Sequence, residues 1–217
     1  QAWWRAWGDA QLDGLVATAL ADHPNLRVLQ ARVQRAEAAA QTVQSQDGPQ
    51  VQAAADATRQ KFSRNFIYPP PLGGSIRTLA DLQLGASWEL DFFGRNRAAL
   101  TAALGQARAA QAEVQAARNA LAAGVARQYA QLARLGEQRR IAERQLAQKN
   151  EMLQLIQQRV KAGLDTQLEL RNSDGSVADA RAQLEQIDEQ MNLVRHSLAA
   201  LTTQTPDALK NLQARLP

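Results

Sequence analysis

The sequence predicts a mainly α-helical fold that contains one two-stranded β-hairpin and long antiparallel coiled-coil helices. Residues 96–161 contain no proline and consist mostly of strong helix formers. Residues 170–201 carry apolar side chains in a heptad pattern, and 51–60 and 80–89 alternate between apolar and polar residues. Aromatic residues make up only 5% of the chain, and much of its 45% hydrophobic content is alanine. These proportions favour thin, elongated packing over a thick core.

Two helices are expected at the start of the chain. Asp9 is a suitable N-cap for the first, which should stop near His23 and Pro24. A second helix is expected from about Asn25 to Gln46, because the following Asp-Gly-Pro sequence cannot continue it. The apolar positions of the first helix recur at helical spacing and are Leu12, Leu15, Val16, Ala19 and Leu20.

Two strands are expected on either side of a long loop. From 51 to 57 the odd positions are apolar, and most even positions of 51–60 are polar; in 80–89 the even positions are apolar and the odd positions are polar or glycine. Between them, 62–78 contains a Tyr-Pro-Pro-Pro-Leu-Gly-Gly sequence that cannot pair as a strand. Alternation of this kind is typical both of a soluble hairpin with one buried face and of transmembrane β-barrel strands. Periodicity alone favours the soluble hairpin, which is the commoner structure.

Two long helices are expected in the second half of the chain. A helix over 96–161 would be roughly 100 Å long, which exceeds the size of a globular domain. Gly163 can end it, and Asp165 or Thr166 can cap the next helix. A short turn between long helices predicts an antiparallel hairpin. The heptad positions of the last helix are Leu170, Val177, Leu184, Met191 and Leu198, interleaved with Ser173, Ala180, Ile187, Val194 and Leu201.

Composition argues against several kinds of chemistry. Cysteine is absent, which removes disulfides and thiolate ligands, and the two histidines, His23 and His196, are far apart in sequence. We therefore expect no metal site and no cofactor. The net charge of +4 is spread along the chain, which indicates solvated helix faces and not a nucleic-acid surface. No run of 18 apolar residues predicts a transmembrane helix, and the lack of a signal peptide before Ala2 suggests a mature or trimmed chain.

One pair of carboxylates could be considered as a general acid and base. Glu89 and Asp91 lie two residues apart beside Trp88 and Phe92, where a strand is expected to end. A structural role is the simpler interpretation. Gly73 and Gly74 are not followed by the Lys-Ser or Lys-Thr of a phosphate-binding loop. The sequence therefore does not predict an enzyme.

Four local motifs carry a resemblance to a known family. Residues 3–12 read WWRAWGDAQL, 24–27 read PNLR, 86–95 read ASWELDFFGR and 159–164 read RVKAGL. With the order of helices and strands, these motifs resemble one repeat of the TolC-like outer membrane factors, in particular the NodT-type lipoprotein subgroup. The third motif is the most specific. It also suits a passage from strand to helix, since Trp88 can lie at a membrane interface and Gly94 permits a sharp turn.

The resemblance implies an outer-membrane channel subunit that extends into the periplasm and conducts small molecules or ions. The strands would then contribute to a trimeric transmembrane β-barrel, reversing the preference for a soluble hairpin. A lipid anchor on a cysteine upstream of Gln1 is implied, and the chain would be the first of two repeats. The implied domains are N-terminal periplasmic helices (1–47), two barrel strands (48–92) with an extracellular loop (62–78), a periplasmic α-hairpin (93–204) and a connector toward a second repeat (205–217).

The resemblance also implies partners: a homotrimer, a periplasmic adaptor protein, an inner-membrane pump and outer-membrane lipid. Expected junction residues between barrel and helices are Trp88, Glu89, Asp91, Gly94 and Arg95. Expected residues at the periplasmic tip, where the adaptor would bind, are Arg159, Lys161, Gly163, Leu164, Asp165 and Thr166. The alternative is a soluble coiled-coil scaffold or periplasmic adaptor hairpin that binds proteins.

One segment departs from the family pattern. Residues 172–176 read NSDGS, where better helix formers are usual in the family. Glycine costs about 1 kcal/mol relative to alanine in a helix, so we expect the last helix to fray or bend there.

Overall fold

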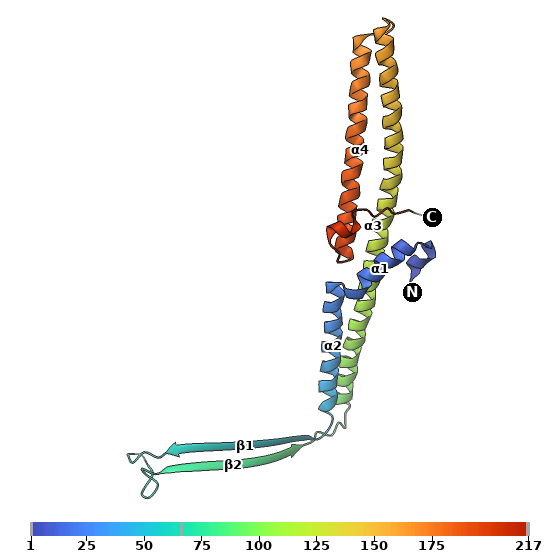
Figure 1. Cartoon of the computed structure of the whole chain (residues 1–217). Helices are drawn as coiled ribbons and strands as arrows, with labels where there is room; N and C mark the ends of the chain where they lie inside the picture. The colour runs from blue at the N-terminus through green and yellow to red at the C-terminus, as the bar shows by residue number, and fades with distance from the viewer. Residues whose placement is uncertain (1, 66, 216–217) are drawn as a thin grey trace. The chain divides into compact units, whose positions relative to one another are not determined.

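The computed structural model of the chain describes residues 2–65 and 67–215, except for the side chain of Asp22. The chain divides into two compact units, Arg32–Gln111 and the combination of Gln1–Ala31 with Ala112–Pro217. In chain order the elements are η1 (Trp3–Trp7), α1 (Ala10–Asp22), α2 (Pro24–Ser45), β1 (Gln50–Lys61), β2 (Ile76–Ser87), α3 (Arg95–Lys161), α4 (Gln167–Leu201) and η2 (Pro206–Leu209), as Figure 1 shows.

The expected helices and strands are present, with modest differences at their ends. Asp9 is the N-cap of α1 and accepts hydrogen bonds from the amides of Gln11 and Leu12. β2 begins at Ile76, earlier than expected, so the loop is shorter than the predicted 62–78. The predicted connector 205–217 contains η2, and its last two positions lie outside the described residues.

The two strands form an antiparallel sheet whose register brings like residues together. The apolar positions of β1 pair with the apolar positions of β2, so that both sets share one face. On the other face, Gln52, Asp56 and Gln60 pair with Gly85, Asp81 and Arg77. Both faces have exceptions: Ala54 and Leu79 lie on the polar face, and Arg59, Lys61 and Thr78 lie on the apolar face. The apolar pairs are Val51–Ala86, Ala53–Leu84, Ala55–Leu82 and Ala57–Ala80.

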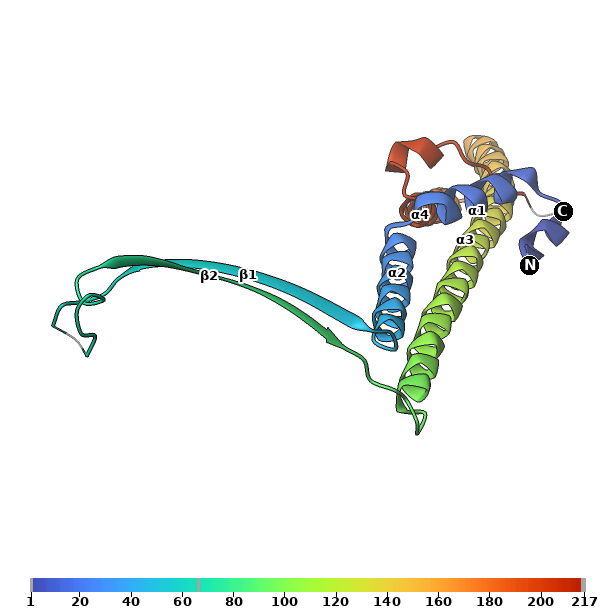
Figure 2. The ribbon, with the colours of Figure 1, turned by 90° about the horizontal axis from the view of Figure 1, so that it is seen from below.

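In the unit Arg32–Gln111, α2 lies beside the first part of α3 (Figures 1 and 2). Ala40 and Ala107 are buried, each with 5% of its surface exposed. Gln111 donates a hydrogen bond from Nε2 to Glu37 Oε1 at 2.8 Å and so links the two helices. Small buried residues allow such helices to approach closely, because packing depends on the side chains at the contact.

In the other unit, α4 runs antiparallel to the second part of α3, as expected for a helical hairpin (Figure 1). All ten predicted heptad positions of α4 are buried or half-buried, which confirms the coiled-coil pattern. The expected fraying at 172–176 does not occur, since α4 is helical throughout this stretch. Lys149 of α3 donates from Nζ to the carbonyl of Ser176 at 3.2 Å. Packing against α3 therefore outweighs the weak helix propensity of the segment.

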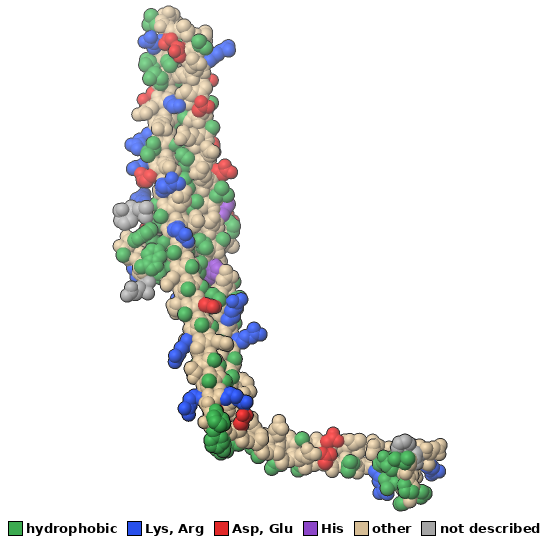
Figure 3. All heavy atoms as spheres, turned by 180° about the vertical axis from the view of Figure 1, so that it is seen from behind, with side chains coloured by type: hydrophobic (Ala, Val, Ile, Leu, Met, Phe, Trp, Pro, Cys, Tyr) green, Lys and Arg blue, Asp and Glu red, His purple; other side chains and the backbone are tan. Residues whose placement is uncertain are grey.

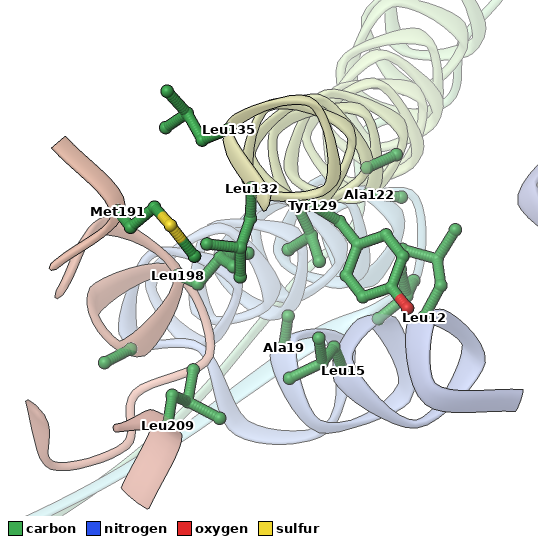
Figure 4. Packing of buried hydrophobic residues seen from close by; sticks show 14 residues of the cluster. Leu12, Leu15, Ala19, Ala122, Tyr129, Leu132, Leu135, Met191, Leu198 and Leu209 are labelled. Carbon is green, nitrogen blue, oxygen red and sulfur yellow. The ribbon is translucent and has the colours of Figure 1, made fainter. Parts of the chain in front are cut away.

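The core of this unit lies where α1 and the end of α4 pack against the middle of α3 (Figure 4). Tyr129, Leu132 and Leu198 have at most 1% of their surface exposed. Leu209 of η2 closes the same cluster. The cluster thus draws together the start, middle and end of the chain.

Candidate functional site

The β-hairpin presents both of its faces to the surroundings. Every residue of β1 and β2 is exposed, including the large apolar side chains of Leu82 (80%) and Leu84 (78%). A two-stranded sheet is at best marginally stable alone in water, and its outer edges carry unpaired N–H and C=O groups. The hairpin therefore requires neighbours to cover its apolar face and to pair its edges.

The junction from β2 to α3 brings together the expected residues from Trp88 to Arg95. Gly94 has a φ of +76°, in the left-handed region, where the chain turns into the helix. Asp91 Oδ2 accepts a hydrogen bond from the amide of Arg97 at 3.0 Å, as expected for a carboxylate at a helix start. This bond, with further ones from the other first amides, lowers the pKa of Asp91.

Glu89 and Asp91 do not act as a pair in this geometry. Glu89 Oε1 lies 2.6 Å from Arg95 Nη2, whereas Asp91 faces the helix amides. The catalytic interpretation of the two carboxylates therefore has no support. In the described part of the chain, no three His, Cys, Asp or Glu residues come together in a way that could hold a metal ion.

The same junction exposes large apolar side chains that the expected site did not include. Phe93 is fully exposed at 100%, Phe92 at 81% and Leu90 at 52%. Trp88 is exposed at 61%. Its Nε1 donates a hydrogen bond to the carbonyl of Asp47 at 3.2 Å, which links the residue after β2 to the segment before β1. Figure 3 shows hydrophobic side chains gathered where the strands meet the helices. The run of aromatic residues in 88–93 was the sequence signal for this patch.

The turn between α3 and α4 is a well-formed helix end. Gly163 has a φ of +73°, its amide bonds to the carbonyl of Val160 at 3.0 Å, and the amide of Leu164 bonds to the carbonyl of Arg159 at 2.8 Å. These two bonds make a Schellman motif. Thr166 then caps α4 by accepting from the amide of Glu169 at 3.2 Å.

One ion pair crosses this turn. Arg159 Nε lies 3.2 Å from Asp165 Oδ2, while Asp165 Oδ1 accepts from the amide of Thr166 at 3.0 Å. Leu164 and Leu168 project outward, exposed at 69% and 68%. The turn therefore combines a rigid backbone with an exposed apolar surface. Leu168 is an addition to the residues expected from sequence.

A hydrogen bond between α1 and α3 was not foreseen from the sequence. Tyr129 donates from Oη to Asp9 Oδ2 at 2.5 Å, and its ring is buried in the core. Burial, together with the neighbouring Asp9 carboxylate, raises the pKa of Tyr129 to about 12. For Asp9, burial acts to raise the pKa, but the bonds from Tyr129, Leu12 and Gln11 outweigh it and lower the pKa. No local pattern could have joined residues 120 positions apart.

Replacing Tyr129 by phenylalanine is expected to lower the free energy of unfolding by about 1.5–3 kcal/mol near neutral pH, because a hydrogen bond to a charged group is lost. The folded state holds the phenolic proton more tightly than the unfolded state. The wild type should therefore lose stability as the pH rises from about 10 to about 12, and Y129F should lack this loss. Chemical denaturation followed by circular dichroism across this pH range measures both. Equal stability of the two proteins at neutral pH would contradict the prediction.

No helix in the described part of the chain combines the length and the hydropathy that crossing a membrane requires.

Residues 15–204 match the family described as outer membrane efflux protein. The chain is 32% identical over 223 residues to the multidrug resistance outer membrane protein MdtQ of Escherichia coli O6:H1, covering 99% of this chain and 47% of MdtQ. The chain belongs to the outer membrane efflux protein family.

Solved structures agree with this assignment. The outer membrane protein VceC of Vibrio cholerae superposes with a TM-score of 0.87 at 30% identity, covering 100% of this chain and 53% of VceC. The outer-membrane channel OprN gives a TM-score of 0.84 at 30% identity, covering 99% of this chain and 48% of OprN. The fold is thus that of the TolC-like channels, and the family is one of outer-membrane proteins. The chain spans about half the length of the relatives it matches.

Proposed function

We propose that the chain forms one repeat of a trimeric outer-membrane channel, a passive conduit through which a tripartite efflux system exports small molecules or ions. The observation that carries the proposal is the hairpin register, which sorts apolar and polar residues onto opposite faces of two fully exposed strands. Transmembrane barrel strands need this division, because one face meets lipid and the other meets water. Closure with strands from further repeats would also pair the free edges.

The aromatic junction fits the same proposal. Trp88, Phe92 and Phe93 are exposed and lie just beyond the end of β2. If the strands span the membrane, these residues would lie at its interface with water. Tryptophan, whose ring is amphipathic, is enriched at such interfaces, and Phe92 and Phe93 add exposed apolar surface beside it. In this arrangement the helices that continue from the junction extend into the periplasm. The loop at the other end of the strands is then extracellular.

The turn between α3 and α4 would be the periplasmic tip that contacts an adaptor protein. Support comes from the exposed Leu164 and Leu168 on a backbone held by the Schellman motif and the Arg159–Asp165 ion pair. Lys161 is exposed beside them. A rigid apolar patch with a charged rim suits recognition by another protein. The proposal includes no enzymatic step, because transport energy would come from an inner-membrane pump.

The soluble coiled-coil scaffold accounts for α3 and α4 equally well. It offers no reason for a hairpin whose apolar face is exposed over its whole length. The channel proposal is therefore preferred.

The test is to express the gene region with its native flanks in a Gram-negative host and to separate the membranes. A trimer in the outer-membrane fraction, detected by cross-linking, is the expected result. A photo-cross-linking residue at position 164 should capture a co-expressed periplasmic adaptor, whereas one at the exposed Leu193, far along α4, should not. A soluble monomer or dimer would overturn the channel proposal, and capture from both positions would overturn the assignment of the tip.

A further inference from the structure

The apolar face of the hairpin ends in basic residues at the loop end of the strands. The four consecutive apolar pairs from Val51–Ala86 to Ala57–Ala80 cover a band of about 20 Å along the strands. The next pair on the same face is Arg59 with Thr78, and the one after it is Lys61 with Ile76. The face that would meet lipid therefore carries two cations at one end.

A third cation lies beside them. The side chain of Arg64 runs over Gly74, where an added Cβ would lie 2.5 Å from Arg64 Nε, so a larger residue at 74 would displace the arginine side chain. Lys61, Phe62 and Arg64 line one hollow of about 540 Å³ together with Ser63 and Gly74. The start of the loop is held against its end, since the amide of Gly74 bonds to the carbonyl of Phe62 at 2.8 Å. The basic end, defined as Arg59, Lys61 and Arg64, is thus a structured feature and not a loose tail.

The charge balance around these cations is one-sided in the described part of the chain. Among the described residues, no carboxylate forms an ion pair with Arg59, Lys61 or Arg64. The acidic residues of the strands, Asp56 and Asp81, lie on the opposite face. Figure 3 shows acidic side chains midway along the hairpin and basic ones at its loop end, next to hydrophobic side chains. A charge on the lipid-facing side is tolerated near the interface but would be costly at the membrane centre.

We infer that the basic end binds the phosphate groups of an anionic lipid in the outer leaflet, an inference that rests on the proposed membrane orientation. The chemistry is charge complementarity: arginine and lysine donate charge-assisted hydrogen bonds to phosphate oxygens, and arginine can do so with two N–H groups. The apolar band next to the cations accommodates the acyl chains of the same lipid. A free phosphate ion would gain no contact with this band, so the site selects the lipid.

The polar face of the hairpin provides a control for removing charge from the apolar face. Arg77 pairs with Gln60 and lies on the polar face, one residue from the Lys61–Ile76 level. Arg77→Gln therefore removes one positive charge at nearly the same height but away from the lipid. The combined change of Arg59→Gln and Lys61→Gln removes cations from the lipid-facing side without altering the apolar band.

The experiment uses the full-length protein with its native flanks, first checked for trimers in the outer membrane and then reconstituted into phosphatidylcholine nanodiscs. Binding of added bis-phosphorylated lipid A is measured by native mass spectrometry, with dephosphorylated lipid A and inorganic phosphate as the other arms. The double variant should bind phosphorylated lipid A roughly tenfold more weakly than the wild type, while R77Q should match the wild type. Inorganic phosphate should not displace the lipid.

Three results would overturn the inference: equal binding by the double variant, equal loss in R77Q, or no preference for phosphorylated over dephosphorylated lipid A. Each of them would leave the channel proposal standing if the protein is a trimer in the outer membrane. Failure of the wild type to form that trimer would overturn both.

Discussion

Leu82→Arg is expected to cost about 2–4 kcal/mol of membrane-inserted stability and to remove most of the trimer from the outer membrane. Leu82 lies midway along the hairpin, opposite Ala55 on the apolar face. A guanidinium at this position would lie near the centre of the hydrocarbon region, where neither water nor a counter-ion can stabilise its charge. Urea titration of refolding into lipid vesicles measures the change, and outer-membrane fractionation reports the amount of trimer.

The neighbouring residue supplies the control for this variant. Gln83 is on the polar face opposite Ala54, so that Gln83→Arg would point into water and should change stability little. A soluble hairpin would tolerate both changes, because both residues are exposed in the chain. Equal behaviour of L82R and Q83R would therefore argue against the membrane assignment of the two faces.

Leu198→Ala is expected to lower the free energy of unfolding by about 2–5 kcal/mol. Leu198 has 0% of its surface exposed and lies in the core between α4 and α3, close to Leu132 in Figure 4. The shorter side chain would leave a cavity, because neighbours held on long helices can move in only partly. The measurement is thermal or denaturant unfolding followed by circular dichroism.

Leu193→Ala is the matched control on the same helix. Leu193 is 58% exposed and outside the core, so its truncation should change stability by less than about 0.5 kcal/mol. A small effect of L198A, equal to that of L193A, would mean that α4 is not held against α3 by this core.

The sequence alone determined the elements and the family. Local signals were strong, since Asp9 and Thr166 cap helices, Gly163 ends one, and the heptads of α4 give its buried side. These features depend on a few neighbouring residues and on a regular period, which can be read without a structure. The 86–95 motif similarly indicated the family that the comparisons show.

The sequence was misleading where packing against another segment outweighs the local structural propensity. The Asn-Ser-Asp-Gly-Ser segment remains helical because α4 is packed against α3 and Lys149 donates to the carbonyl of Ser176. The loop boundary was also misplaced, because the ladder continues to the pair of Ile76 with Lys61. In both cases a partner segment supplies contacts that its own residues do not reveal.

Only the tertiary structure decided which distant groups meet. It joined Tyr129 to Asp9, set Arg159 against Asp165 across the turn, and assigned Glu89 and Asp91 to separate partners. It also fixed the register that gathers Arg59 and Lys61 on the apolar face and leaves Arg77 on the other. Register depends on the pairing of two strands, and a slip of one residue would exchange the faces, so the alternation within each strand could not define it.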